Sequence, residues 1–301
     1  MTTRMRKLCA LQVKGREYIL GERTWIMGVI NVTPDSFSDG GKFFEMEKAV
    51  ERGLQMAEDG ADILDIGGES TRPGSAPVPE EEEIRRVVPV IRALRLSTDR
   101  LISIDTTKAG VAKAALDEGA DIINDISALG FDPGMADVVG GEQAPVILVH
   151  MQGTPRTMQV APHYQDVLGE IKDFFRRKIE EARGRGIQRD RVIIDPGIGF
   201  GKRLKDNLVL INHLNSFEDL DCPILMGVSR KHFIGKILDL PAGERLEGTL
   251  AAAVMCVVRG AHILRVHDVR ETRRAVAVAE AILSEESAGT DFGVKKNRYV
   301  C

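Results

Sequence analysis

Short apolar segments alternate with longer amphipathic segments along most of the chain, and this alternation constrains the fold more than any other feature. Nearly continuous apolar strands separated by helices indicate a parallel sheet that is covered on both faces. The expected helices include residues 45–59, 80–96, 108–118, 165–185 and 268–284. The expected strands are WIMGVIN (25–31), DILDIG (62–67), LISID (101–105), DIIND (121–125), VILVHM (146–151), VIID (192–195), ILMGVS (224–229) and HILRVH (262–267).

Eight such units in about 260 residues predict an α/β fold, a (β/α)8 TIM barrel. A doubly wound open sheet is the alternative, but it usually has fewer strands in one domain. Residues 1–22 are expected to form a β hairpin that turns at Lys14-Gly15-Arg16. Residues 23–287 are expected to form a single barrel domain, and residues 288–301 a tail.

Composition narrows the function classes. The net charge is −4 with mixed signs, which argues against a general nucleic-acid binder. The four cysteines are scattered and form no CxxC pair, so the sequence suggests neither a zinc site nor a disulfide framework. The longest apolar run, residues 250–258, is too short to span a membrane, and the N-terminus lacks the pattern of a signal peptide. We expect a cytoplasmic protein with no membrane partner.

Polar side chains recur at the C-terminal end of every expected strand. In a barrel these ends converge at one mouth, where active sites lie. Taken singly, an Asp or Asn at such a position is often only a helix N-cap, and a His in a strand often only packs and forms hydrogen bonds. All eight strands share the pattern, however: Asn31, the segment GGESTRPG, Asp105, Asn124, His150, Asp195, SRK (229–231) and RVH (265–267).

The last strand carries the strongest single signal. Arg265 and His267 alternate onto one strand face, where a cationic fork beside an imidazole suits an anion, alone or carrying a metal. SRK and Arg72 add positive charge, and Asp105 and Asp195 are expected to point into the lumen.

Two other motifs are interpreted more simply. DPGIGFGK (195–202) fails the P-loop and Rossmann patterns, so its glycines are expected to allow a tight turn and a close approach to a ligand. The acidic run 80–83 is expected to be a solvated first helical turn.

The motifs together resemble one family, dihydropteroate synthase. GVINVTPDSFSDGG, DIGGESTRPG, SIDTTK, NDIS, HMQGTP, DPGIGFGK, GVSRK and RVHDV look like its blocks in its order, over residues 25–269. The resemblance implies a TIM barrel that joins 4-aminobenzoate to (7,8-dihydropterin-6-yl)methyl diphosphate, releases pyrophosphate and uses Mg2+. It also implies a homodimer, for which the apolar helix LAAAVMCVV is a candidate surface, although burial against the barrel explains this apolar run equally well.

Carried over residue by residue, the resemblance assigns roles to the strand ends and loops. Asp195 would accept the two parallel donors of the pterin edge. Asn31 would supply an oxygen ligand to Mg2+. Asp35 would face a carbocation in an SN1-like reaction, on a first loop that closes as a lid. The other implied sets are pterin (Asp105, Asn124, Met151, Lys231, Arg265), diphosphate (Asn31, Arg72, Arg265, His267) and 4-aminobenzoate (Thr71, Arg72, Pro73, Phe200, Ser229, Lys231).

Two rival hypotheses stay open at this point. A pterin-binding methyltransferase that passes a methyl group from methyltetrahydrofolate to a corrinoid would share the barrel and the Asp/Asn pocket, but would have no diphosphate to bind. A catalytically silent homologue is the second rival, although Asn31, Lys231 and Arg265 are present. The chain departs from the family pattern at His232, at Lys205 and in the segment ALGFDPGM, which puts loop details in doubt.

Overall fold

The computed structural model describes residues 6–32, 42–70 and 75–285. Eight parallel strands form one sheet in the order β8-β7-β6-β5-β4-β3-β10-β9, and a bridge between Ile194 and Ile224 joins β8 to the segment before β9. The strands are β3 (Trp25–Asn31), β4 (Ile63–Gly67), β5 (Leu101–Asp105), β6 (Ile122–Asp125), β7 (Val146–Val149), β8 (Val192–Asp195), β9 (Leu225–Met226) and β10 (Ile263–Val266). The predicted TIM barrel is confirmed.

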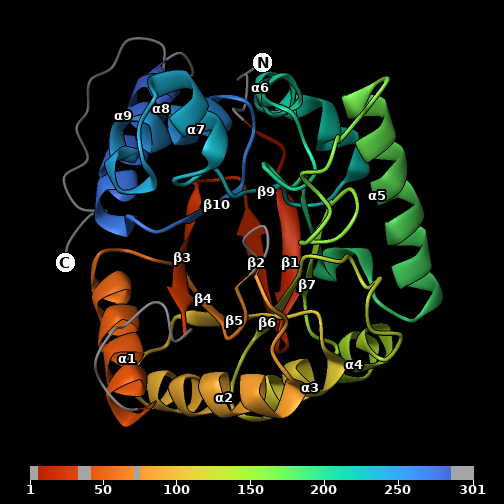
Figure 1. Ribbon diagram of the computed structural model, residues 1–301, viewed down its shortest axis with the longest axis vertical. Coiled ribbons are helices and arrows are strands. Elements are labelled where there is room, and N and C mark those ends of the chain that lie inside the picture. Colours follow the sequence, from red (N-terminus) through yellow and green to blue (C-terminus); the bar gives the residue numbers. More distant parts are fainter. Residues whose placement is uncertain (1–5, 33–41, 71–74, 286–301) are drawn as a thin grey trace.

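Helices surround this barrel, as Figure 1 shows. Between the strands and helices lies the larger apolar core, which includes Leu64, Ile66, Ile104 and Leu148. The helices are α1 (Lys42–Glu58), α2 (Glu80–Ser97), α3 (Ala109–Asp117), α4 (Met135–Glu142), α5 (Val167–Gly184), α6 (Leu204–Asn212), α7 (His232–Leu238), α8 (Leu246–Val258) and α9 (Val269–Glu285). Within the described parts of the chain, no helix is long and apolar enough to cross a membrane.

The predicted hairpin is present and closes one end of the barrel. Strands β1 (Cys9–Val13) and β2 (Arg16–Leu20) pair antiparallel. Their inward side chains share a second apolar core with the first inward residues of the barrel strands, among them Leu11, Leu20, Trp25, Ile63, Ile122 and Ile263. Among the described residues, the bottom of the barrel is therefore filled, which directs attention to the opposite end for a ligand.

Three expectations about local structure were wrong. Arg16 belongs to β2 and pairs with Val13, so the turn is Lys14-Gly15 alone, where both residues have positive φ (45° and 76°). The strand expected at 224–229 is shorter, because β9 covers only Leu225–Met226 and Ile224 forms an isolated bridge; the chain then turns at Ser229 and Arg230, where Arg230 has φ of 56°. Glu83 is not solvated but fully buried, and pairs with Lys108. The tail expected at 288–301 lies outside the described residues.

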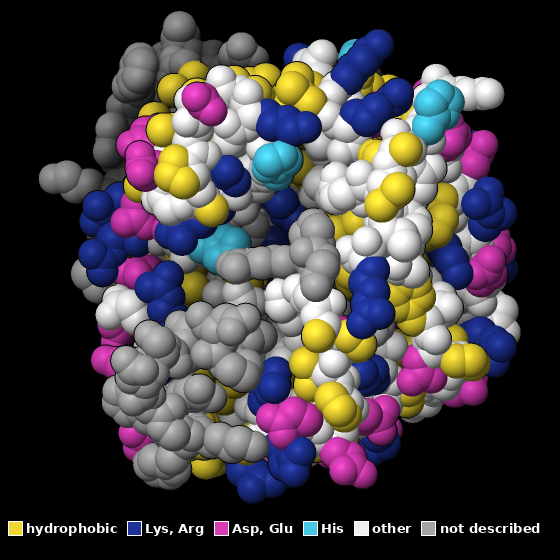
Figure 2. Space-filling model, in the orientation of Figure 1, with side chains coloured by type: hydrophobic (Ala, Val, Ile, Leu, Met, Phe, Trp, Pro, Cys, Tyr) yellow, Lys and Arg dark blue, Asp and Glu magenta, His cyan; other side chains and the backbone are white. Residues whose placement is uncertain are grey.

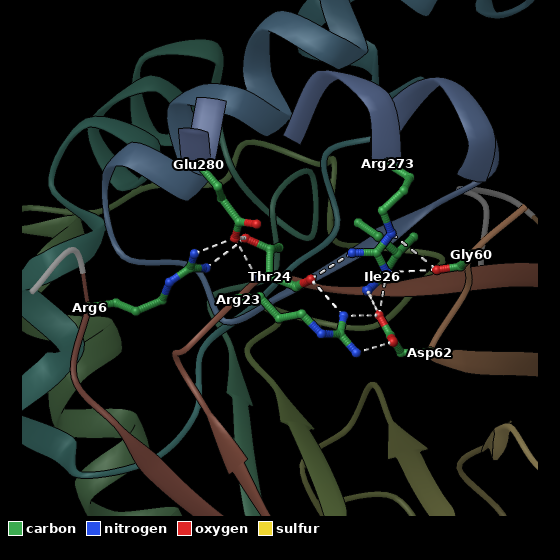
Figure 3. A network of polar contacts seen from close by, with 8 residues as sticks. All are labelled: Arg6, Arg23, Thr24, Ile26, Gly60, Asp62, Arg273 and Glu280. Atoms are coloured by element: carbon green, nitrogen blue, oxygen red, sulfur yellow. Dashed lines mark hydrogen bonds and ion pairs between the residues drawn. The ribbon is translucent and has the colours of Figure 1, made fainter. Parts of the chain in front are cut away.

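A polar network joins Arg6, near the start of the described chain, to Glu280 on α9 through Thr24, which directly precedes β3 (Figure 3). The guanidinium of Arg6, fully buried, donates to Thr24 Oγ1 (2.7 Å), the Ala261 carbonyl (2.6 Å) and Glu280 on α9 (2.6 Å). Beside it, Arg23 and Arg273 both pair with Asp62, which also accepts the Ile26 N–H at 2.8 Å. The network ties the segment before the hairpin to the last helix.

Candidate active site at the mouth of the barrel

The expected polar strand ends do converge. Asp105 ends β5, Asn124 lies next to it on β6, and Asp195 ends β8, and their exposed fractions are 7%, 2% and 5%. Arg265 reaches this group from β10, on the other side of the mouth. Alternation along each strand places these side chains on the inward face, directly above the apolar layer of the lumen.

Two carboxylates hold the guanidinium of Arg265. Its Nε donates to Asp65 at 2.6 Å and its Nη2 donates to Asp105 at 2.5 Å. Burial raises the pKa of Asp105 to about 7, with Arg265 opposing this shift and Asp65 adding to it. Asp65 was missed in the sequence because it lies within an apolar strand rather than at its end. The signal that could have found it is a lone carboxylate in a run that is otherwise all core.

Buried polar atoms at this site lack partners among the described residues. Asn124 donates its Nδ2 to Asp65 at 3.3 Å, while its Oδ1 accepts nothing. Asp65 Oδ1 and the Ser103 hydroxyl are likewise buried and have no hydrogen-bond partner among the described residues. Because an unpaired buried polar group costs about 1–3 kcal/mol, such a cluster is typical of a binding site.

Asp195 is positioned by the turn that follows it. Its Oδ1 accepts the Gly197 N–H at 2.7 Å, and its Oδ2 faces the space beside Gly227. Burial raises the pKa of Asp195 above its ordinary value, while the Gly197 N–H and Lys231 oppose this. Because each carboxylate oxygen has more than one lone pair, Asp195 can accept further hydrogen bonds beside the one from Gly197.

The glycines of DPGIGFGK act as predicted, allowing a tight turn. Gly197 has φ of 72°, and a Cβ there would lie 2.0 Å from the His150 carbonyl oxygen. Gly201 has φ of 64°, and its Cβ would lie 2.6 Å from the Gln152 carbonyl oxygen. Only glycine fits these positions.

A buried lysine that sequence reasoning did not single out braces the same turn. Lys202 is 4% exposed and donates to His150 Nδ1 (2.9 Å), the His150 carbonyl (3.2 Å) and the Phe200 carbonyl (3.0 Å). Burial lowers the pKa of Lys202 to about 7, and burial beside Lys202 lowers the pKa of His150 to about 2. His150 is therefore a neutral acceptor, buried beside Lys202.

Lys231 enters the mouth from the start of α7. Its ammonium lies 4.4 Å from the centre of the Phe200 ring, in cation–π geometry. Burial lowers the pKa of Lys231 to about 8, and Arg265 lowers it further while Asp195 and Asp105 oppose this. The loops after β8 and β9 thus bring a cation and an aromatic face together.

Ser229 and His267 are hydrogen-bonded to each other. The Ser229 hydroxyl lies 3.0 Å from His267 Nδ1 and accepts the His267 backbone N–H at 3.2 Å. Burial and the nearby Arg265 lower the pKa of His267 to about 4. The imidazole is therefore neutral at pH 7, and a hydroxyl that donates to Nδ1 leaves an Nε2–H as donor.

The remaining predicted residues divide into three groups. Asn31, at the end of β3, and Met151, after β7, are half-buried, and Met151 packs against the inner core. Arg230 of SRK turns away and pairs with Asp268 at 2.5 Å. Asp35, Thr71, Arg72 and Pro73 lie outside the described residues.

The departures from the family pattern lie away from these contacts. His232 is exposed at the first position of α7. Lys205 belongs to α6, where it lines an outer groove with Leu208 and His213. In ALGFDPGM, Ala128 and Leu129 have positive φ (50° and 64°), and Asp125 accepts the Leu129 N–H at 2.8 Å. Neither His232 nor Lys205 disturbs the polar cluster.

Comparisons with known proteins agree with this geometry. The family model described as "Pterin binding enzyme" matches residues 27–267. A dihydropteroate synthase of Escherichia coli is 47% identical over 259 residues, covering 86% of this chain and 92% of the relative. One of Synechocystis is 46% identical over 263 residues, covering 87% and 91%.

Solved structures extend the agreement to three dimensions. The Xanthomonas albilineans dihydropteroate synthase with 4-aminobenzoic acid has a TM-score of 0.85 at 46% identity, covering 92% of this chain and 98% of that one. The same enzyme in complex with 7,8-dihydropteroate has a TM-score of 0.82 at 44% identity, covering 91% and 98%. The chain belongs to the dihydropteroate synthase family of pterin-binding enzymes.

Proposed function

We propose that this chain is a dihydropteroate synthase, which condenses (7,8-dihydropterin-6-yl)methyl diphosphate with 4-aminobenzoate to give 7,8-dihydropteroate and pyrophosphate. The observation that carries the proposal is the convergence of Asp105, Asn124 and Asp195 with Arg265 in one barrel mouth. These side chains offer buried acceptors beside a planar cation, which is the pattern that a flat heterocycle rich in N–H donors requires.

The pterin would lie across the mouth against these groups. Its amino group and adjacent ring N–H would donate in parallel to Asp195, which ends β8 at the mouth. Another ring N–H donates to the unpaired Oδ1 of Asn124. Asp105 and Lys231 meet the remaining ring heteroatoms, Met151 packs at the edge, and the Arg265 guanidinium stacks on the ring face.

The diphosphate would lie on the side of the mouth formed by β3 and β10. Arg265 supplies a permanent positive charge, and His267 supplies an Nε2–H donor when the Ser229 hydroxyl donates to its Nδ1. The Asn31 side chain lies at the end of β3, next to β10 in the sheet. Arg72 belongs to the same expected set.

The reaction then needs positioning and charge compensation rather than a strong nucleophile. The exocyclic C–O bond breaks, its electron pair leaves with the diphosphate, and the electron-rich dihydropterin disperses the positive charge. The amine nitrogen of 4-aminobenzoate forms the new C–N bond and afterwards loses a proton. Arg265 and Lys231 stabilise the separating charges in a buried site, where such interactions are strong. Asp35 is the carboxylate expected to face the cation.

The residues present fit a Mg2+ ion that is held mainly by the substrate. The Asn31 amide oxygen is a suitable hard ligand, and the structure, over the ranges that it describes, contains no cluster of three or more His, Cys, Asp or Glu residues that could hold a metal. Mg2+ commonly takes few protein ligands together with phosphate oxygens and water. Such an ion would neutralise charge on the leaving diphosphate.

The second substrate would bind beside Phe200, Ser229 and Lys231. Phe200 and the Lys231 ammonium form an apolar and cationic wall that suits an aromatic ring with a carboxylate. Thr71, Arg72 and Pro73 are expected to complete this wall. Because a sulfonamide resembles 4-aminobenzoate, we expect sulfonamides to compete for the site. The Yersinia pestis relative has been solved in a sulfonamide drug complex.

We further propose a cytoplasmic homodimer. Met255 and Val258 of α8 are 42% and 41% exposed, and α9, which packs beside α8, exposes Val278 and Ile282 (62% and 65%). Figure 2 shows basic and acidic side chains interspersed over one face, which does not favour a nucleic-acid partner. Sedimentation of the wild type and of Val258→Asp tests the dimer, since a monomeric wild type would contradict it.

Pyrophosphate release in the presence of both substrates tests the function. We expect release that depends on 4-aminobenzoate and on Mg2+, with formation of 7,8-dihydropteroate. Transfer of a methyl group from methyltetrahydrofolate to a corrinoid would favour the rival methyltransferase. The absence of both reactions, with pterin binding retained, would indicate a silent homologue.

A further inference from the structure

Asp65 is a buried carboxylate at the centre of the site that the proposed reaction leaves without a role. It lies in the middle of β4, is 0% exposed, and pairs across the sheet with Ser103 of β5. Asp105 lies two residues further along β5, opposite Gly67. Asp65 is therefore one inward layer deeper than Asp105, below the level at which a pterin would bind.

One oxygen of Asp65 is shared by two groups that would touch the pterin. Its Oδ2 accepts the Arg265 Nε–H at 2.6 Å and the Asn124 Nδ2–H at 3.3 Å. Arg265 comes from β10 and Asn124 from β6, so the carboxylate joins opposite sides of the mouth. Neither bond uses an atom that the pterin would need.

The contact to Arg265 differs from the contact that Asp105 makes. Asp105 accepts from Nη2, at the outer end of the guanidinium, and is itself expected to bind the pterin. When Asp105 turns to the substrate, its hydrogen bond to Arg265 Nη2 weakens. Asp65 holds Nε, next to the side-chain stem, and can keep the guanidinium plane in place throughout.

The contact to Asn124 fixes which end of the amide faces the ligand. An ionised carboxylate only accepts hydrogen bonds, so the Nδ2 of Asn124 must point to Asp65. Its Oδ1, which has no partner among the described residues, is then the atom presented to a pterin N–H. If the Asn124 amide were reversed, its Nδ2–H group would face the pterin N–H, and two donors would oppose each other.

We propose that Asp65 is a positioning residue of the pterin subsite, which orients the Arg265 guanidinium and the Asn124 amide from beneath through a single carboxylate oxygen. This inference rests on the proposed function. It adds a third carboxylate to the site, one that acts through its neighbours without touching the substrate.

The variant Asp65→Asn tests this, because it keeps the size of the side chain but presents either an amide nitrogen to two donors or a single weaker acceptor. The matched control is Asp62→Asn, which removes another buried carboxylate that pairs with arginines, three residues earlier and at the opposite end of the barrel. Calorimetry with an unreactive pterin, steady-state kinetics and thermal melting are measured for both variants.

We expect Asp65→Asn to weaken pterin binding at least about tenfold, as loss of a charged hydrogen bond implies, while KM for 4-aminobenzoate changes less than about twofold. Asp62→Asn should lower the melting temperature but leave pterin affinity unchanged. In an Arg265→Lys background, which lacks Nε, Asp65→Asn should weaken pterin binding much less than in the wild type.

Three outcomes separate this inference from the function on which it rests. A wild type that forms no dihydropteroate overturns the proposed function. An active wild type with unchanged pterin affinity in Asp65→Asn overturns the positioning role alone, and an equal loss in both backgrounds overturns the part of that role that acts through Arg265. If Asp65→Asn fails to fold, Asp65→Glu keeps the charge but displaces it by one methylene, and wild-type pterin affinity in that variant would equally contradict the role.

Discussion

The guanidinium of Arg265 lies between Asp65 and Asp105, two carboxylates at different depths of the same lumen. Several residues of this site combine a structural bond with a free face directed to the ligand. Asp195 bonds Gly197 through one oxygen, and Asn124 bonds Asp65 through its nitrogen. At the scale of single residues, the site is therefore pre-organised by its own hydrogen bonds.

Asp195→Asn should weaken pterin binding by about 1–3 kcal/mol while the fold survives. The Gly197 N–H can still donate to the amide oxygen, which directs the new NH2 group at the pterin donors. Calorimetry with a pterin analogue measures the loss. Asp206→Asn, on α6 outside the mouth, serves as the control. Wild-type affinity in Asp195→Asn would remove this residue from the pocket.

The pH dependence of kcat/KM for the dihydropterin substrate should show a decline above about pH 8. Lys231 must be protonated to donate to the ring, and burial lowers its pKa to about 8, so the active form is complete below this pH and is lost above it. Lys231→Met should lower turnover at least about tenfold, since one charged contact disappears.

The variant Lys231→Arg distinguishes the titration of Lys231 from that of Lys202, because burial also lowers the pKa of Lys202, to about 7. Arginine keeps its charge to much higher pH, so the decline should move upward in this variant. A decline at the same pH in Lys231→Arg would assign it to another group.

Among the elements, the hairpin fills the closed end of the barrel. The Arg6–Glu280 pair ties the segment before the hairpin to α9, with the Arg6 side chain 0% and the Glu280 side chain 13% exposed. Glu280 also accepts the Thr24 N–H at 2.5 Å, directly before β3 begins. A stable closed end leaves the loops of the mouth free to serve the ligand.

Arg6→Met should lower the free energy of unfolding by about 3–5 kcal/mol, because it leaves the Glu280 carboxylate buried without its cation. Urea unfolding measures this. The double variant Arg6→Met/Glu280→Met should lose less than the sum of the single variants, since no unpaired charge remains. Additive losses would show that the pair has no coupling.

The elements also show how far the sequence could predict this structure. Apolar strands with polar ends predicted the barrel and brought Asp105, Asn124 and Asp195 to one mouth. Asp65 could not be assigned, because its role depends on which side chains meet across the lumen from β4, β6 and β10. The same reason explains Arg230. The SRK motif predicted a cation at the mouth, but the Arg230 guanidinium pairs with Asp268. The apolar segment ILMGVS likewise does not reveal that β9 ends at Met226.

At the scale of the whole molecule, the residues expected to bind the two substrates meet at one hydrogen-bonded pair, Ser229 and His267. Ser229 belongs to the expected 4-aminobenzoate set and His267 to the diphosphate set, and their side chains lie 3.0 Å apart. The His267 backbone N–H also donates to Ser229. A ligand that orients either residue therefore orients the other, which favours coupled binding.

We expect 4-aminobenzoate to bind poorly alone and more tightly, by at least about fivefold, when Mg2+ and pyrophosphate are present. Pyrophosphate that accepts from His267 Nε2 would hold the imidazole in the tautomer that takes the Ser229 hydroxyl at Nδ1, and would so present Ser229 in one orientation to the carboxylate. By linkage, 4-aminobenzoate must tighten pyrophosphate binding by the same factor. Ser229→Ala should bring this factor close to one, because the shared hydrogen bond is lost. Titrating each ligand with and without the other decides the matter, and equal affinities in the wild type would show that the two subsites bind independently.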